Sequence, residues 1–113
     1  MNWSTLNTLT QLEQIKEESK ANPVVIFKHS TRCSISRTVL DRLERNWKHE
    51  DLGHVKAYYL DLISYREVSN QIAEQFEIEH ESPQVLIISQ GKAVYDQSHL
   101  GIDYNQLRQE LKN

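Results

Sequence analysis

Residues 24–36, VVIFKHSTRCSIS, predict a strand, a turn and the start of a helix, and these elements indicate the fold. Residues 24–27 form an unbroken β-branched and aromatic run, which predicts a central strand covered on both faces. From residue 34 to about residue 48, apolar side chains recur at every fourth position, which predicts an amphipathic helix. These positions are Ile35, Val39, Leu43 and Trp47. Cys33 therefore falls between the carboxyl end of a buried strand and the start of a helix.

The segments on either side of this stretch alternate between helical and strand periodicity. Residues 5–20 place Leu side chains and one Ile on a single helical stripe, with Ser4 as the expected N-cap. Residues 54–60 alternate as a strand does, and a third helix is predicted from about Tyr65. The first two thirds of the chain thus predict the order α, β, α, β, α.

The last third predicts a hairpin and a short final helix. Residues 85–88 and 92–97 have the composition of strands, and Gln90-Gly91 between them suits a tight turn. Asp103 is the candidate cap of the final helix. We expect an α/β fold in one domain, residues 1–113, in the order α-β-α-β-α-β-β-α. The thioredoxin architecture has this order, here with a mixed four-stranded sheet flanked by helices.

Composition excludes several classes of function. The chain has 113 residues, of which 38% are hydrophobic and 26% charged, as in an ordinary globular protein. Thirteen basic and sixteen acidic residues give a net charge of -3, and no basic cluster suits nucleic acid. The longest apolar runs are too short to span a membrane, and the N-terminus has no secretory signal. We therefore expect a cytoplasmic protein that binds neither nucleic acid nor membrane.

Metal binding is also disfavoured. A single cysteine excludes an intrachain disulfide and a cysteine-rich zinc site. The five histidines show no ligand spacing such as His-x-x-x-His. We expect no metal site, and we expect the histidines to lie at the surface. They are His29, His49, His54, His80 and His99.

The position of Cys33 favours a reactive thiol. Unpaired N–H groups and the positive end of the helix dipole stabilise a thiolate at a helix N-terminus. Arg32, Arg37, Lys28 and His29 are near in sequence and either act in the same direction or point into solvent. The alternative is an inert cysteine.

Two further motifs belong to the candidate site. Ser36 occupies the position of the second cysteine in Cys-x-x-Cys enzymes, so its hydroxyl either hydrogen-bonds the Cys33 thiolate or is simply a first-turn serine. Ser34 is a capping or first-turn residue in one interpretation and part of the substrate site in another. Ser82-Pro83 directly precedes a buried strand, where we hypothesise a cis peptide bond.

Residues 27–36, FKHSTRCSIS, together with Ser82-Pro83-Gln84, resemble the monothiol bacilliredoxins of the YtxJ-like family. The resemblance covers nearly the whole chain. It implies a thioredoxin-like oxidoreductase that removes bacillithiol from protein mixed disulfides through Cys33. Family members usually carry proline after the cysteine, where this chain has Ser34. That difference bears on redox tuning and substrate fit, because proline is rigid and lacks an N–H donor.

The resemblance also implies the partners and the substrate contacts. No bound cofactor is expected, since bacillithiol serves as a thiol co-substrate, and bacillithiolated proteins are the clients. Bacillithiol or a thiol reductase would release the adduct from Cys33. Pro83 would face Cys33 in the cis form, and the backbone of Ser82 would pair with the substrate. Arg32 and Arg37 either hold the carboxylates of bacillithiol or remain solvated.

Two other functions remain open. A thioredoxin-like binding or chaperone module would leave Cys33 without a chemical role. A thiol peroxidase would need a Pro-x-x-x-Thr-x-x-Cys motif, but this chain has Ile26 and Ser30 at the proline and threonine positions. The binding module is therefore the main alternative to the oxidoreductase.

Overall fold

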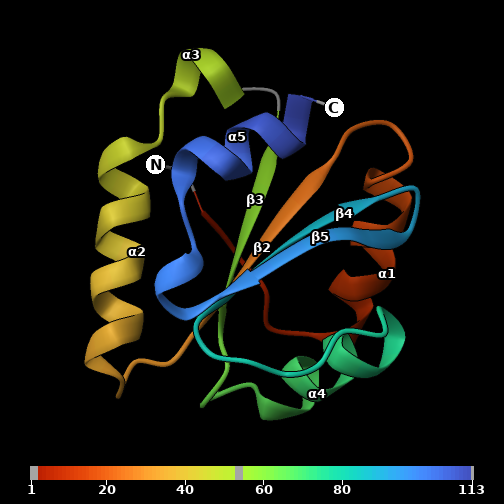
Figure 1. The fold of residues 1–113 in the computed structure, drawn as a ribbon. Helices are drawn as coiled ribbons and strands as arrows, with labels where there is room; N and C mark the ends of the chain where they lie inside the picture. Colours follow the sequence, from red (N-terminus) through yellow and green to blue (C-terminus); the bar gives the residue numbers. More distant parts are fainter. Residues whose placement is uncertain (1–2, 53–54, 113) are drawn as a thin grey trace.

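A computed structural model describes residues 3–52 and 55–112 of the chain (Figure 1). Strands and helices alternate along most of it, and a single 3-10 turn at His99–Gly101 precedes the last helix. The elements are β1 (Ser4–Thr5), α1 (Leu9–Glu18), β2 (Val24–His29), α2 (Ser34–Asn46), α3 (His49–Leu52), β3 (Lys56–Asp61), α4 (Arg66–Gln75), β4 (Gln84–Ser89), β5 (Lys92–Ser98) and α5 (Tyr104–Lys112).

The strands form one mixed sheet in the order β1-β3-β2-β4-β5. β3 runs parallel to β1 and β2, whereas β4 runs antiparallel to β2 and to β5. β2 is therefore the central strand, and every one of its six residues is buried. The predicted α/β thioredoxin-like fold is confirmed.

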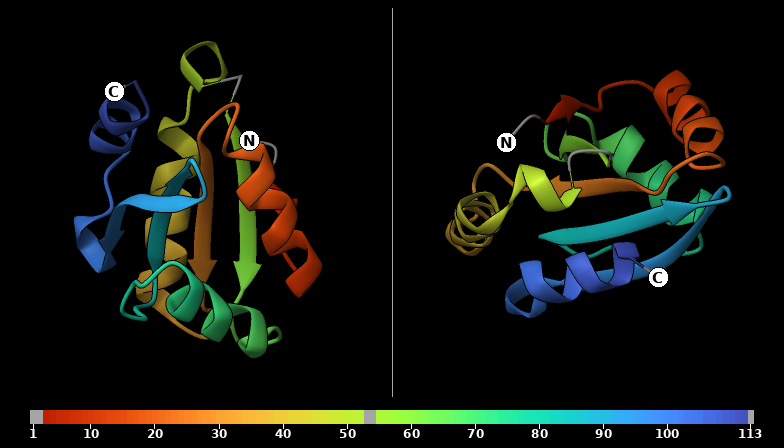
Figure 2. Two further views of the ribbon diagram at one scale, coloured as in Figure 1. Left: turned by 90° about the vertical axis from the view of Figure 1, so that its right-hand side faces the viewer. Right: turned by 90° about the horizontal axis from the view of Figure 1, so that it is seen from above.

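Helices cover both faces of the sheet, and Figure 2 shows the sheet between the two helical layers. Alternate side chains of β2 enter two separate cores, because successive side chains of a strand point to opposite faces. Val24 and Ile26 pack with α1 and α4. Val25 and Phe27 pack with α2 and α5. Burial on both faces explains why this strand reads as a continuous apolar run.

The sheet has five strands, so the expected number of four was wrong. Ser4 lies in β1 opposite Tyr58 of β3 and does not cap the first helix. Thr8 is the cap instead: its side chain accepts a hydrogen bond from the Gln11 N–H, while the Gln11 side chain accepts one from the Thr8 N–H. The short helix α3 was also not expected. Neither a two-residue strand nor a four-residue helix is long enough to show a periodic pattern.

The predicted hairpin and final helix are confirmed. Gln90 and Gly91 have positive φ angles of 54° and 76°, as the tight turn between β4 and β5 requires. The Asp103 side chain caps α5 by accepting a hydrogen bond of 3.2 Å from the Gln106 N–H. Within residues 3–52 and 55–112, no helix has the length and apolar character needed to cross a membrane.

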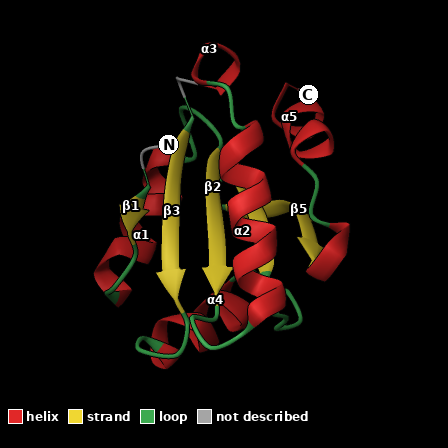
Figure 3. Ribbon diagram, turned by 90° about the vertical axis from the view of Figure 1, so that its left-hand side faces the viewer, coloured by secondary structure: helices red, strands yellow, loops and turns green. Residues whose placement is uncertain are grey.

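The residues of the candidate site lie at one edge of the sheet. The parallel strands β2 and β3 both end there, and α2 begins at that edge after the turn that follows β2 (Figure 3). β4 is antiparallel to β2, with Lys28 opposite Gln84, so β4 begins at the same edge. The segment before β4, which contains Ser82-Pro83, therefore arrives beside the turn that carries Cys33.

Candidate active site at Cys33

Cys33 is the N-cap of α2, as predicted. Its backbone is extended, with φ of −108° and ψ of 120°, and its side chain is half-buried as a free thiol. Its carbonyl accepts the first helical hydrogen bond, 3.1 Å from the Arg37 N–H, and its own N–H donates to the Ser30 carbonyl. In the part of the chain that the structure describes, the thiol makes no capping hydrogen bond. The first-turn N–H groups of α2 lack helical acceptors, so they are placed to stabilise a thiolate.

Ser36 is fully buried, and its hydroxyl is held by two residues that precede Cys33. Its Oγ lies 2.7 Å from Nδ1 of His29 and accepts a hydrogen bond of 3.1 Å from the Ser30 N–H. These bonds tie the first turn of α2 to the end of β2. The contact expected in the sequence, a bond from Ser36 to the thiolate, remains a prediction. When Nε2 carries the ring proton of His29, the Ser36 O–H donates to Nδ1.

His29 is buried, so the expectation of a surface histidine was wrong for this residue. It is the last residue of β2, and its ring lies 5.5 Å from that of Tyr59 and 6.2 Å from that of Phe27. Burial lowers the pKa of His29, which keeps the imidazole neutral near pH 7. A neutral ring suits its bond to Ser36. Lys28 and His29 extend β2 two residues beyond the apolar run of residues 24–27. This extension of the strand is the sequence signal from which burial of His29 could have been predicted.

Lys28 is also fully buried, on the opposite face of the sheet from His29. Its Nζ lies 2.8 Å from Nδ1 of His80 in the segment before β4. Burial lowers the pKa of Lys28 to about 8, while the charge of Glu81 opposes that shift. The expectation that Lys28 either supports the thiolate or points into solvent missed this arrangement, because its partner is 52 positions away.

Ser82-Pro83 forms a cis peptide bond, as hypothesised. Pro83 is buried, and its carbonyl accepts a hydrogen bond of 2.9 Å from the His99 N–H. Ser82 is half-buried, and its Oγ has no hydrogen-bond partner among the described residues. Lys28 pairs with Gln84, so the chain one residue earlier places Pro83 beside the end of β2. Their roles toward a substrate remain predictions.

The other candidate residues lie on the exposed surface around Cys33. Arg32, Ser34 and Arg37 are all exposed, and the positive charge of Arg37 contributes to lowering the pKa of His29. The Ser34 carbonyl accepts a hydrogen bond of 3.0 Å from the Thr38 hydroxyl within α2. Ile35 is 48% exposed, which places an apolar side chain beside the thiol. The substrate contacts assigned to Arg32, Ser34 and Arg37 remain predictions.

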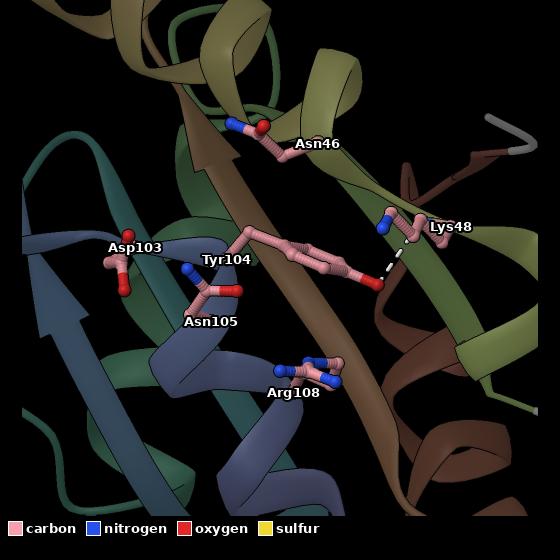
Figure 4. Close-up of a pocket in the computed structure, with 6 residues that line it drawn as sticks. All are labelled: Asn46, Lys48, Asp103, Tyr104, Asn105 and Arg108. Atoms are coloured by element: carbon pink, nitrogen blue, oxygen red, sulfur yellow. Dashed lines mark hydrogen bonds between the residues drawn. The ribbon is translucent and has the colours of Figure 1, made fainter.

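A polar pocket lies at the other end of α2 and is separate from this site (Figure 4). It lies between Asn46 and Lys48, at and beyond the end of α2, and the first turns of α5. The Tyr104 hydroxyl accepts a hydrogen bond of 3.1 Å from the Lys48 N–H there. Cys33 lies at the start of α2, so this pocket takes no part in thiol chemistry.

Comparisons with known proteins agree with this geometry. The model of the family described as monothiol bacilliredoxin BrxC matches residues 4–107. A solved structure provisionally described as an oxidoreductase with a thioredoxin fold is 32% identical, with a TM-score of 0.77, over 93% of this chain and 89% of that one.

Thioredoxins share the fold at lower identity. The thioredoxin of Fasciola hepatica is 20% identical, with a TM-score of 0.72, over 96% of this chain and 95% of its own. That of Trypanosoma brucei brucei is 18% identical, with a TM-score of 0.74, over 98% and 88%. With a single cysteine at the start of α2 and a family match over most of its length, this chain belongs to the monothiol bacilliredoxin family.

Proposed function

We propose that this protein is a monothiol thiol–disulfide oxidoreductase that removes bacillithiol from client proteins through Cys33. The observation that carries the proposal is the placement of the chain's one cysteine at the N-cap of α2, at the carboxyl edge of the central strand. A helix N-terminus stabilises the thiolate that attacks a disulfide and the thiolate that leaves when the adduct is resolved. Membership of the bacilliredoxin family supports protein mixed disulfides of bacillithiol as the substrate class.

The reaction is an exchange in which one disulfide replaces another. The Cys33 thiolate attacks the bacillithiol sulfur, the bond between bacillithiol and the client breaks, and a disulfide joins Cys33 to bacillithiol. The client thiolate leaves and takes a proton from water. A second thiolate, from bacillithiol or a thiol reductase, then attacks the bound bacillithiol sulfur and releases the Cys33 thiolate. The chain has no second cysteine, so this step requires an external thiol.

The surface around Cys33 provides groups suited to this substrate. The exposed guanidinium groups of Arg32 and Arg37 are matched in geometry to the carboxylates of bacillithiol. The backbone of Ser82 and the ring of Pro83 form the opposite wall, against which a client segment would lie. Ser34 adds an N–H donor beside the thiol, where the family usually has proline.

Intact-mass analysis tests the proposal. The reduced protein is incubated with one client protein carrying either bacillithiol or glutathione in a mixed disulfide. We expect the bacillithiolated client to lose the adduct as this chain gains it, with slower transfer of glutathione. Cys33→Ser should transfer neither. Undiminished transfer by Cys33→Ser would refute the mechanism, and client binding without any transfer would favour the binding module.

A further inference from the structure

Lys28 is a charged side chain in the core of the fold. It is 0% exposed in the central strand, between the pairing partners Leu60 in β3 and Gln84 in β4. A buried ammonium group costs folding free energy unless it is paired and hydrogen-bonded. The Lys28 Nζ donates a hydrogen bond to Nδ1 of His80. A lysine at this position therefore needs an explanation other than packing.

The partner of Lys28 belongs to the segment that joins α4 to β4. Gln84, which lies beside Lys28, also reaches this segment: its Nε2 donates a hydrogen bond of 3.0 Å to the Glu79 carbonyl. Lys28 and Gln84, two polar side chains of the sheet, thus hydrogen-bond the consecutive residues His80 and Glu79. The next residue of the segment is also held, because Nε2 of His99 lies 3.2 Å from a carboxylate oxygen of Glu81.

The same segment ends at the wall of the thiol site. Only Glu81 separates His80 from Ser82-Pro83. On the other side, β2 ends at His29, one residue after Lys28, and the turn of residues 30–32 leads from it to Cys33. One strand of the sheet therefore carries both the turn with the nucleophile and the lysine that holds the opposite wall. Lys28 itself is fully buried, and its bond to the exposed His80 ring lies where the core meets the surface.

We propose that Lys28 and His80 are positioning residues, whose hydrogen bond holds the Ser82-Pro83 wall at the distance from Cys33 that a mixed-disulfide substrate requires. The inference rests on the proposed function and extends it to two residues remote from the reacting sulfurs. Neither residue touches the substrate. Both act by setting the place of the backbone against which it binds.

The charge states of the pair make this positioning dependent on pH. The groups that face His80 are Lys28 from β2, Arg66 from α4 and the adjacent Glu81. Burial and the nearby Lys28 lower the pKa of His80, so near pH 7 its neutral ring accepts from Lys28. Protonation would place an N–H opposite the ammonium group and break the bond. Loss of this bond should therefore add to the decline of exchange in acid, at a pH below the ordinary pKa of histidine.

Two substitutions at His80 separate the hydrogen bond from the bulk of the side chain. His80→Asn keeps an acceptor at the position of Nδ1, whereas His80→Leu has none. We expect His80→Leu to lower kcat/KM for a bacillithiolated client about tenfold, mainly through KM, which is the effect of one hydrogen bond. His80→Asn should stay within about twofold and should decline less in acid than the unsubstituted protein, since the amide does not titrate and only the thiolates of the reaction are still protonated.

Alkylation of Cys33 by iodoacetamide distinguishes positioning from a general structural effect. Its rate should be the same in both variants, because the N-terminus of α2 is unchanged. Lys28→Met should reproduce the loss seen in His80→Leu, and the double variant should be no worse than either single one. Normal exchange by His80→Leu, or losses that add in the double variant, would overturn the inference.

A readout independent of catalysis keeps this test apart from that of the proposed function. NMR titration of His80 should show its pKa rising in Lys28→Met, because the neighbouring cation is removed. Absence of exchange in the unsubstituted protein would refute the function but not the pairing. An unchanged His80 titration would refute the pairing whatever the activity.

Discussion

Replacing Lys28 with methionine should make the protein more stable at neutral pH. Lys28 is 0% exposed, and its pKa lies at about 8 in the folded protein instead of the ordinary 10.5, because burial disfavours the charged form. Below about pH 8 both the folded and the unfolded chain carry the proton, so the folded state bears the full cost of the buried charge. Methionine has a similar length and no charge, and it would enter the same core as Ile26.

The pKa difference sets the magnitude of this effect. Moving a pKa from 10.5 to about 8 costs the folded state about 3 kcal/mol at neutral pH. The lost hydrogen bond to His80 offsets about 1 kcal/mol of the gain, since the exposed His80 ring can bind water instead. We therefore expect Lys28→Met to raise the free energy of unfolding by about 2 kcal/mol near pH 7.

The sign of the pH dependence provides a second check. As the pH rises above about 8, the folded state loses its proton before the unfolded chain does, so the cost of burying Lys28 declines. The advantage of Lys28→Met should therefore shrink by about 1 kcal/mol between about pH 7 and pH 9. Taking the difference between the two proteins cancels the titration of other groups, including Tyr58 and Lys56.

Urea unfolding at a series of pH values measures both quantities. Lys20→Met is the matched control, because Lys20 is exposed and pairs only at the surface with Glu17. It should change the free energy of unfolding by less than about 0.5 kcal/mol and should leave its pH slope unaltered. A Lys28→Met protein that is less stable at neutral pH, or whose advantage does not vary with pH, would refute this reasoning. A stabilised variant with impaired exchange would show that the lysine is kept for function at the expense of stability.

Two further predictions concern Ser36 in the first turn of the helix that carries the thiol. Ser36→Ala should lower the free energy of unfolding by about 2 to 3 kcal/mol in urea titrations, because the Ser30 N–H and His29 Nδ1 lose a buried partner; the exposed Ser34→Ala should change it little. Ser36→Cys places a second thiol one helical turn from Cys33 and should form an internal disulfide, visible by mass spectrometry as loss of two hydrogens. A bacillithiol adduct as persistent as in the unsubstituted protein would argue against that geometry.

The parts of the site that the sequence predicted correctly depend on local patterns. The apolar run of residues 24–27 required burial on both faces, and the four-residue spacing after Cys33 required a helix starting there. Together these two patterns are enough to place the thiol at the carboxyl end of a central strand. The hairpin was equally local, because Gln90-Gly91 suits the positive φ angles of its turn.

The errors concern elements and contacts that local patterns do not encode. β1 is only two residues long and exists because Ser4 and Thr5 pair with β3, more than 50 positions away. Local patterns predict a surface position for His29 and leave the position of Lys28 open, because polar side chains usually avoid the core. Each is buried beside a partner that satisfies it, Ser36 for His29 and His80 for Lys28.

Local sequence patterns are enough to predict the order of the main elements, the position of Cys33 at the start of a helix and the resemblance to the bacilliredoxins. Two contacts depend instead on the packing of the folded chain: Ser36 bonds to His29 and Ser30, and Lys28 joins the core of the sheet to the segment before Ser82-Pro83. Periodicity and helix starts follow from the preferences of neighbouring residues, whereas the partner of a buried polar group depends on which distant segment packs over it.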